Sequence, residues 1–184
     1  MPPLHSCKLA FIGGGNMATA MISGLLSTGI TPSHIIVSEP VDIVRSKLAA
    51  LGIRTTTSNA NATVDADIVV IAVKPQVTSI VCTELASAWA TRSALPTVLS
   101  IAAGITLSSL CNWLRTPDGR VPHAVRAMPN TPALVGEGAA GVFPMAEVTP
   151  EEKELVGALI GSISHATEWV SNEGMLDVVT GLSG

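Results

Sequence analysis

Short apolar runs of strand length alternate with longer amphipathic stretches along this chain. The runs are Leu9–Ile12, Ile35–Val37 and Ile68–Val73, the last of them rich in β-branched residues, and stretches with helical spacing of apolar residues separate them. This alternation is typical of βαβ units, in which helices cover both faces of a parallel sheet. The sequence therefore predicts an α/β fold with a mostly parallel, doubly wound sheet and flanking helices.

Further strands and helices follow from the same periodicity. We expect additional strands at Ile53–Thr55, Thr97–Ile101, Ala124–Met128, Ala139–Phe143 and, as an edge strand, Ser164–Val170. We expect helices at Asn16–Ser27, Asp42–Leu51, from Pro75 onward, at Pro150–Ile160 and at Asn172–Thr180, with a polar loop around Asn59. The helix at Pro150 is marked by a capping box, Thr149-Pro150-Glu151-Glu152.

Composition narrows the class of protein further. Hydrophobic residues make up 47% of the 184 residues and charged residues only 13%, so the chain can bury enough apolar surface to fold. No apolar run approaches the ~18 residues of a membrane helix. A net charge of −4 with no Tyr and two Phe argues against nucleic-acid binding. Three unevenly spaced cysteines suit a reducing compartment, which predicts a cytoplasmic protein, and neither they nor the histidines show metal-ligand spacing.

A glycine-rich turn lies between the first predicted strand and the first predicted helix. Its pattern is Gly13-x-Gly15-x-x-Ala18. In a dinucleotide-binding turn, Gly13 permits the tight turn, Gly15 lets backbone amides approach a diphosphate, and Ala18 allows close helix–strand packing. The diphosphate would lie at the positive end of the helix. An ordinary βα turn is the alternative, but the strand, the helix and a second strand ending in an acid favour a Rossmann-like nucleotide site.

That acid is Glu39, 24 residues past Gly15. A carboxylate at this position accepts hydrogen bonds from ribose hydroxyls and repels a 2′-phosphate, which favours NADH. Arg45 could offset that repulsion, so the sequence leaves NADH and NADPH both open. The alternative for Glu39 is a surface acid beside Pro40 that caps the next helix.

Other candidate residues follow the predicted strands, because ligands of open parallel sheets lie outside the carboxyl ends of the strands. Lys74 after the fourth strand would face a cofactor phosphate or ribose, or would simply be a solvated lysine. The small residues after the fifth strand would leave room for a flat ring. Asn130, between Pro129 and Pro132, would hydrogen-bond a ligand or satisfy its own turn.

Taken in order, these segments resemble pyrroline-5-carboxylate reductases over nearly the whole chain after Lys8. The resemblance is carried by Phe11–Ala18, Ala72–Gln76, Ser100–Ile105, Met128–Ala133, Glu137-Gly138 and Asp177–Gly184. It implies reduction of 1-pyrroline-5-carboxylate to L-proline, the last step of proline biosynthesis, with NADPH or NADH. It also implies cofactor contacts from Ile12, Gly13, Gly14, Gly15, Asn16, Met17, Ser38, Glu39, Asn59, Ala72, Val73, Lys74, Pro75, Ile101, Ala102 and Ala103. Asn130 is the candidate near the reacting centre.

The resemblance further implies a domain arrangement. Residues 1–170 would form the dinucleotide-binding domain, and residues 171–184 would begin a helical dimerisation domain that completes the substrate pocket in this family. We therefore expect a homo-oligomer at full length, reduced activity for a chain that ends at Gly184, and an exposed apolar patch around Asn172–Thr180. Two alternatives remain: a nonenzymatic NAD(P)-binding module, or a reductase of the β-hydroxyacid dehydrogenase type.

Overall fold

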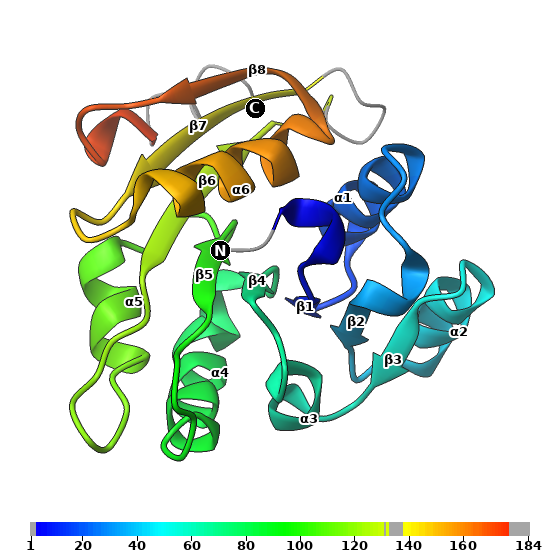
Figure 1. The fold of residues 1–184 in the computed structure, drawn as a ribbon, viewed down its shortest axis with the longest axis horizontal. Helices are drawn as coiled ribbons and strands as arrows, with labels where there is room; N and C mark the ends of the chain where they lie inside the picture. The colour runs from blue at the N-terminus through cyan, green and yellow to red at the C-terminus, as the bar shows by residue number, and fades with distance from the viewer. Residues whose placement is uncertain (1–2, 131, 133–137, 177–184) are drawn as a thin grey trace.

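A single eight-stranded sheet organises the molecule in the computed structural model, which describes residues 3–130, 132 and 138–176. The strands are β1 (Leu9–Ile12), β2 (Ile35–Ser38), β3 (Arg54–Thr56), β4 (Ile68–Ile71), β5 (Thr97–Ser100), β6 (Ala124–Pro129), β7 (Gly138–Pro144) and β8 (Ser164–Trp169). Their order is β3-β2-β1-β4-β5-β6-β7-β8, with β3 and β8 at the two edges (Figure 1). The predicted doubly wound α/β fold is confirmed.

All strands run parallel to their neighbours except that β7 is antiparallel to β6. β1 lies between β2 and β4, so that Ile12 is in register with Ser38 on one side and Ile71 on the other. The order reverses between β1 and β4, and at such a point a crevice opens outside the carboxyl ends of the strands.

Helices cover both faces of the sheet. The α-helices are α1 (Asn16–Ser27), α2 (Asp42–Ala50), α3 (Asn59–Thr63), α4 (Pro75–Ala88), α5 (Leu107–Trp113) and α6 (Pro150–Gly161), with 3-10 turns η1 (Leu4–Ser6) and η2 (Pro32–His34). Apolar residues of α1, α2 and α6 share one core cluster with one face of the strands. Those of α3, α4 and α5 form the second cluster on the other face. Because both faces are covered, β1 and β4 are buried along their whole length.

α6 begins as the sequence predicts. Thr149 Oγ1 accepts from the Glu152 amide and the Glu152 carboxylate accepts from the Thr149 amide, which completes the capping box. The same carboxylate accepts from Thr97 Oγ1 at 2.7 Å and pairs with His123 Nδ1 at 2.7 Å. Burial raises the pKa of Glu152, but these hydrogen bonds outweigh it and hold that pKa below its usual value.

The structure differs from the sequence expectations around Asn59 and covers only part of the helix expected near the C-terminus. The polar loop predicted around Asn59 is wrong, because Ser58 Oγ accepts from the Asn61 amide and caps the short helix α3. The helix predicted at Asn172–Thr180 is described only as far as Leu176, where Gly174–Leu176 are helical, and the apolar patch expected there falls mostly outside the described residues. No helix among the described residues is long and apolar enough to cross a membrane.

Candidate functional site

A cavity of about 480 Å³ opens at the carboxyl ends of β1 and β4, which are neighbours within the sheet. Nine of the predicted site residues line it: Ile12, Gly13, Gly15, Ser38, Glu39, Asn59, Ala72, Val73 and Lys74. Four residues that the sequence does not predict also line it: Pro40, Thr57, Val77 and Val81. Val77 and Val81 are four residues apart on α4, and this spacing after a strand end was the signal available for them.

Gly13 shapes the turn that forms one wall of this cavity. It has a φ of +98°, and a Cβ there would lie 2.7 Å from the carbonyl oxygen of Ala72. Its amide donates to Ser38 O at 2.8 Å, which ties the turn to the end of β2. Glycine at position 13 is therefore required by the fold itself, for both conformation and space.

Gly15 differs from Gly13 because nothing among the described residues requires a glycine there. Its φ is −66°, which any residue adopts, and a Cβ on it would meet no atom within 4 Å. Gly15 is exposed, lines the cavity and is the N-cap of α1, and within the described residues no side chain caps this helix. The first amides of a helix have no intrahelical acceptor, so those of Asn16 and Met17 are available to an anion.

Glu39 is buried and turned toward the backbone of the glycine turn. Its Oε2 accepts from the Gly14 amide at 2.8 Å and its Oε1 accepts from the Val41 amide at 2.9 Å. Only 8% of the residue is exposed. The structure therefore gives this carboxylate a backbone role that the sequence alternative of a helix-capping acid partly anticipated.

Arg45 belongs to the same turn. Its Nη1 donates to the carbonyl oxygens of Glu39 at 2.8 Å and Pro40 at 2.7 Å, and its Nη2 donates to Asp42 Oδ1 at 2.9 Å. The guanidinium is thus engaged by backbone and carboxylate acceptors, and Arg45 does not line the described cavity. The expectation that Arg45 offsets the charge of Glu39 toward a phosphate stays a prediction.

Ser38 and Asn59 face each other across the end of β2. Ser38 Oγ donates to Asn59 Oδ1 at 2.7 Å, and Asn59 Nδ2 donates to Glu84 Oε2 at 2.8 Å. These two bonds fix the orientation of the Asn59 amide. The result is a hydrogen-bonded wall that connects the end of β2 to α3 and, through Glu84, to α4.

The segment after β4 lines the cavity beside the glycine turn. Ala72 and Val73 are half-buried, Lys74 is exposed as the N-cap of α4, and Pro75 occupies the first position of that helix. Among the described residues that line the cavity, Lys74 carries the one positive charge. Together with the amino end of α1, it favours an anionic ligand.

The remaining predicted residues lie along the same edge but outside the cavity lining. Ile101, Ala102 and Ala103 follow β5, and only Ala102 among them is buried. Asn130 follows β6, and its Oδ1 accepts from the Ala139 amide at 2.9 Å, closing the base of the loop between β6 and β7. Thr131, Ala133 and Glu137, which also carry the resemblance, lie outside the described residues, as do residues 177–184.

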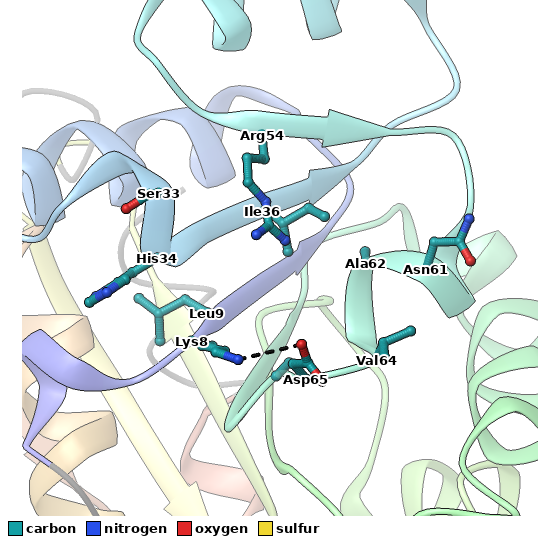
Figure 2. A pocket seen from close by; sticks show the side chains of 11 residues that line it. Lys8, Leu9, Ser33, His34, Ile36, Arg54, Asn61, Ala62, Val64 and Asp65 are labelled. Carbon is teal, nitrogen blue, oxygen red and sulfur yellow. Dashed lines mark hydrogen bonds and ion pairs between the residues drawn. The ribbon is translucent and has the colours of Figure 1, made fainter.

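A smaller hollow of about 90 Å³ lies at the other end of the strands, where β1, β2 and β3 begin. Figure 2 shows its lining side chains, including Lys8, His34 and Arg54, with Lys8 Nζ paired to Asp65 at 3.4 Å. Both partners of this pair are largely exposed to solvent. In the part of the chain that the structure describes, no three His, Cys, Asp or Glu residues are grouped to hold a metal ion.

The fold and this site define a Rossmann-type α/β domain with a glycine turn built to receive an anion at a helix N-terminus. The chain belongs to the family described as NADP oxidoreductase, coenzyme F420-dependent, whose model matches residues 8–104.

Known proteins give further comparisons. The chain is 41% identical to a pyrroline-5-carboxylate reductase of Pseudomonas aeruginosa over 96% of this chain and 62% of the relative. It is 39% identical to one of Haemophilus influenzae, again over 96% and 62%. A solved pyrroline-5-carboxylate reductase from Coxiella burnetii superposes with a TM-score of 0.89 at 34% identity, covering 97% of this chain and 64% of that one. The predicted resemblance is confirmed, and the chain spans less than two thirds of these relatives.

Proposed function

We propose that this chain is the nucleotide-binding part of an NAD(P)H-dependent reductase. The observation that carries the proposal is Gly15, a glycine that the protein's own packing does not explain, beside an uncapped helix N-terminus on a 480 Å³ cavity. A diphosphate seated against its backbone accounts for both features, because a side chain at position 15 would occupy the space that the phosphate needs. The residues present therefore fit a dinucleotide.

The substrate we propose is 1-pyrroline-5-carboxylate, and the product is L-proline. The support is the similarity to pyrroline-5-carboxylate reductases over 96% of the chain. NADPH or NADH supplies a hydride to the C=N carbon of the imine, and a proton on the ring nitrogen completes the reduction. The contribution of this chain is to hold the reactants in place, which lowers the barrier by proximity and orientation.

The residues at this end of the sheet divide into parts in this proposal. The amides after Gly15 bind the diphosphate; Ser38, Asn59 and Thr57 line the adenosine side; and Lys74 adds a positive charge. Ile101, Ala102 and Ala103 lie farther along the edge, where the nicotinamide end would extend. Asn130 is proposed near the reacting centre, with its Nδ2 as the group that faces a ligand, since its Oδ1 accepts from Ala139.

The proposal extends to organisation and location. Residues 1–170 would be the dinucleotide-binding domain and 171–184 the start of a helical domain that pairs two copies. Within the described residues, Cys7, Cys82 and Cys111 form no disulfide, which supports a reducing compartment such as the cytoplasm. Neither nucleic acid nor a membrane is among the partners proposed.

The test is an assay of NADPH oxidation with 1-pyrroline-5-carboxylate. We would measure it for the chain alone and for a chimera that appends the part of the Pseudomonas aeruginosa relative beyond the matched region. The proposal predicts saturable NADPH binding by both proteins and turnover by the chimera.

Other outcomes would overturn the proposal in distinct ways. Nucleotide binding without turnover in either protein would identify a nonenzymatic binding module. Turnover of a 3-hydroxy acid but not of the cyclic imine would identify a β-hydroxyacid dehydrogenase type. Absence of nucleotide binding would refute the proposal as a whole.

A further inference from the structure

Glu39 is a buried carboxylate whose two oxygens both serve the backbone. It accepts from the Gly14 amide through Oε2 and from the Val41 amide through Oε1, at 2.8 and 2.9 Å. A buried carboxylate is costly unless hydrogen bonds compensate it, and two backbone donors do so here. The side chain thereby bridges the β1–α1 turn and the β2–α2 turn.

The contact with Gly14 is close enough to fix that peptide. A Cβ on Gly14 would lie 2.9 Å from Leu48 Cδ1 and 3.4 Å from Glu39 Cγ, so the glycine packs directly against both side chains. The preceding peptide is held as well, because the Gly13 amide donates to Ser38 O. With both peptides held from the β2 side, the next amides in the chain are those at the start of α1, which meet the cavity.

The direction of the Glu39 side chain is itself fixed. Arg45 donates to the carbonyl oxygens of Glu39 and Pro40, which pins the backbone from which the carboxylate extends. A hydrogen bond from a ribose would have to compete with those from the Gly14 and Val41 amides, which already engage both carboxylate oxygens. If the carboxylate turned to a ribose, the Gly14 and Val41 amides would lose the acceptor that they have in this structure.

We infer that Glu39 is a positioning residue of the nucleotide site, which holds the Gly14 peptide so that the turn presents its phosphate-binding amides. This inference rests on the proposed function for its ligand, NADH or NADPH. It gives Glu39 no role in discriminating NADH from NADPH, since the carboxylate is hydrogen-bonded to the Gly14 and Val41 amides. The loss of its carboxylate therefore weakens the binding of NADH and of NADPH by the same factor.

The experiment compares the wild-type chain with Glu39→Gln and, as a control, Glu154→Gln on the exposed face of α6. The dissociation constants for NADPH and NADH are measured by fluorescence titration, with thermal unfolding of each ligand-free protein alongside. A glutamine amide nitrogen cannot accept from an amide, so E39Q loses one of the two bonds. We expect both dissociation constants to rise about tenfold in E39Q, and neither to change in E154Q.

A second measurement uses the wild-type chain alone and needs no variant to fold. Scalar coupling across the hydrogen bond from the Gly14 nitrogen to the Glu39 carboxylate carbon is recorded by NMR before and after NADH is added. The inference predicts that this coupling is present in the free protein and persists in the complex. A residue that reads the ribose would lose the coupling on binding.

The failures are distinguishable from one another. A rise in the NADH constant alone would overturn the inference and assign ribose recognition to Glu39, whereas unchanged constants for both nucleotides would show that the contact has no role in binding. If the wild-type chain binds neither nucleotide, the proposed function fails. In that case an absent coupling in the free protein would refute the positioning contact separately.

Discussion

Substituting Gly15 with alanine separates the two reasons for which a glycine can occupy this turn. Its φ of −66° and ψ of −175° suit alanine, and the added Cβ meets no protein atom within 4 Å. If the space beside Gly15 belongs to a nucleotide diphosphate, the methyl group should interfere with the ligand and leave the fold intact.

The size of the effect follows from these contacts. Alanine lowers the entropy of the unfolded chain, which stabilises the fold by about 0.4–1 kcal/mol, but it is a poorer N-cap than glycine by roughly 0.5–1 kcal/mol. The free energy of unfolding should thus change by less than about 0.5–1 kcal/mol. Losing one charge-assisted hydrogen bond to phosphate costs about 1.5–3 kcal/mol, which weakens the binding of NADPH by roughly 10- to 100-fold.

Gly13→Ala is the matched control, because it is expected to show the opposite pattern. At a φ of +98° an alanine costs about 1–2 kcal/mol, and its contact of 2.7 Å with the Ala72 carbonyl adds about 1–3 kcal/mol more. For a chain of this length, that lowers the melting temperature by roughly 4–20 °C. The assays are calorimetric titration with NADPH and thermal unfolding of both ligand-free variants. A stable Gly15→Ala protein that binds NADPH as tightly as wild type would refute the reasoning.

Three further predictions concern stability. Glu152→Gln should reduce the loss of stability at acid pH, because the pKa of Glu152 is lower in the folded than in the unfolded chain. The contribution of Glu152 to stability is complete above its ordinary pKa of 4.5 and is lost as the pH falls through the folded-state pKa. If urea unfolding shows the same fall in stability at acid pH for both proteins, the prediction is contradicted. Gly24→Ala should destabilise the fold by about 1–3 kcal/mol, since its Cβ would lie 2.2 Å from the carbonyl oxygen of Ser162, just after α6. Gly157→Ala, within α6, has room for its Cβ and should stabilise the fold by about 0.5–1 kcal/mol. Equal denaturation midpoints for the two variants would contradict this prediction. Glu173→Ala should cost about 1–3 kcal/mol, because Glu173 accepts from the buried Arg126 at 2.6 Å, and chemical denaturation without a lower midpoint would argue against that pair.

Much of the fold follows from local sequence signals. The bounds of α1 are predicted to the residue, because a glycine turn precedes the helix and Gly29 follows it. The capping box locates the start of α6 in the same way. α3 was missed because a five-residue helix has almost no periodicity, and its one signal, the N-cap Ser58, resembles an ordinary turn residue.

The cavity was predicted in outline, since the carboxyl ends of parallel strands meet at one edge. The direction of individual side chains was not predictable. Glu39 occupies the expected position, but its carboxylate points to the Gly14 amide, a contact between residues 25 apart that depends on how two turns pack. Val77 and Val81 are not predicted, because the sequence does not show which residues of α4 pack beside the end of β4.

The central claim is that a dinucleotide binds with its diphosphate at the amino end of α1. The most direct test is an amide chemical-shift map of the labelled chain as NADPH is added. The account predicts saturable shifts that are largest at Gly15, Asn16 and Met17, with no change around Lys8 and His34, where the strands begin. No shifts, or shifts confined to that end of the strands, would contradict it.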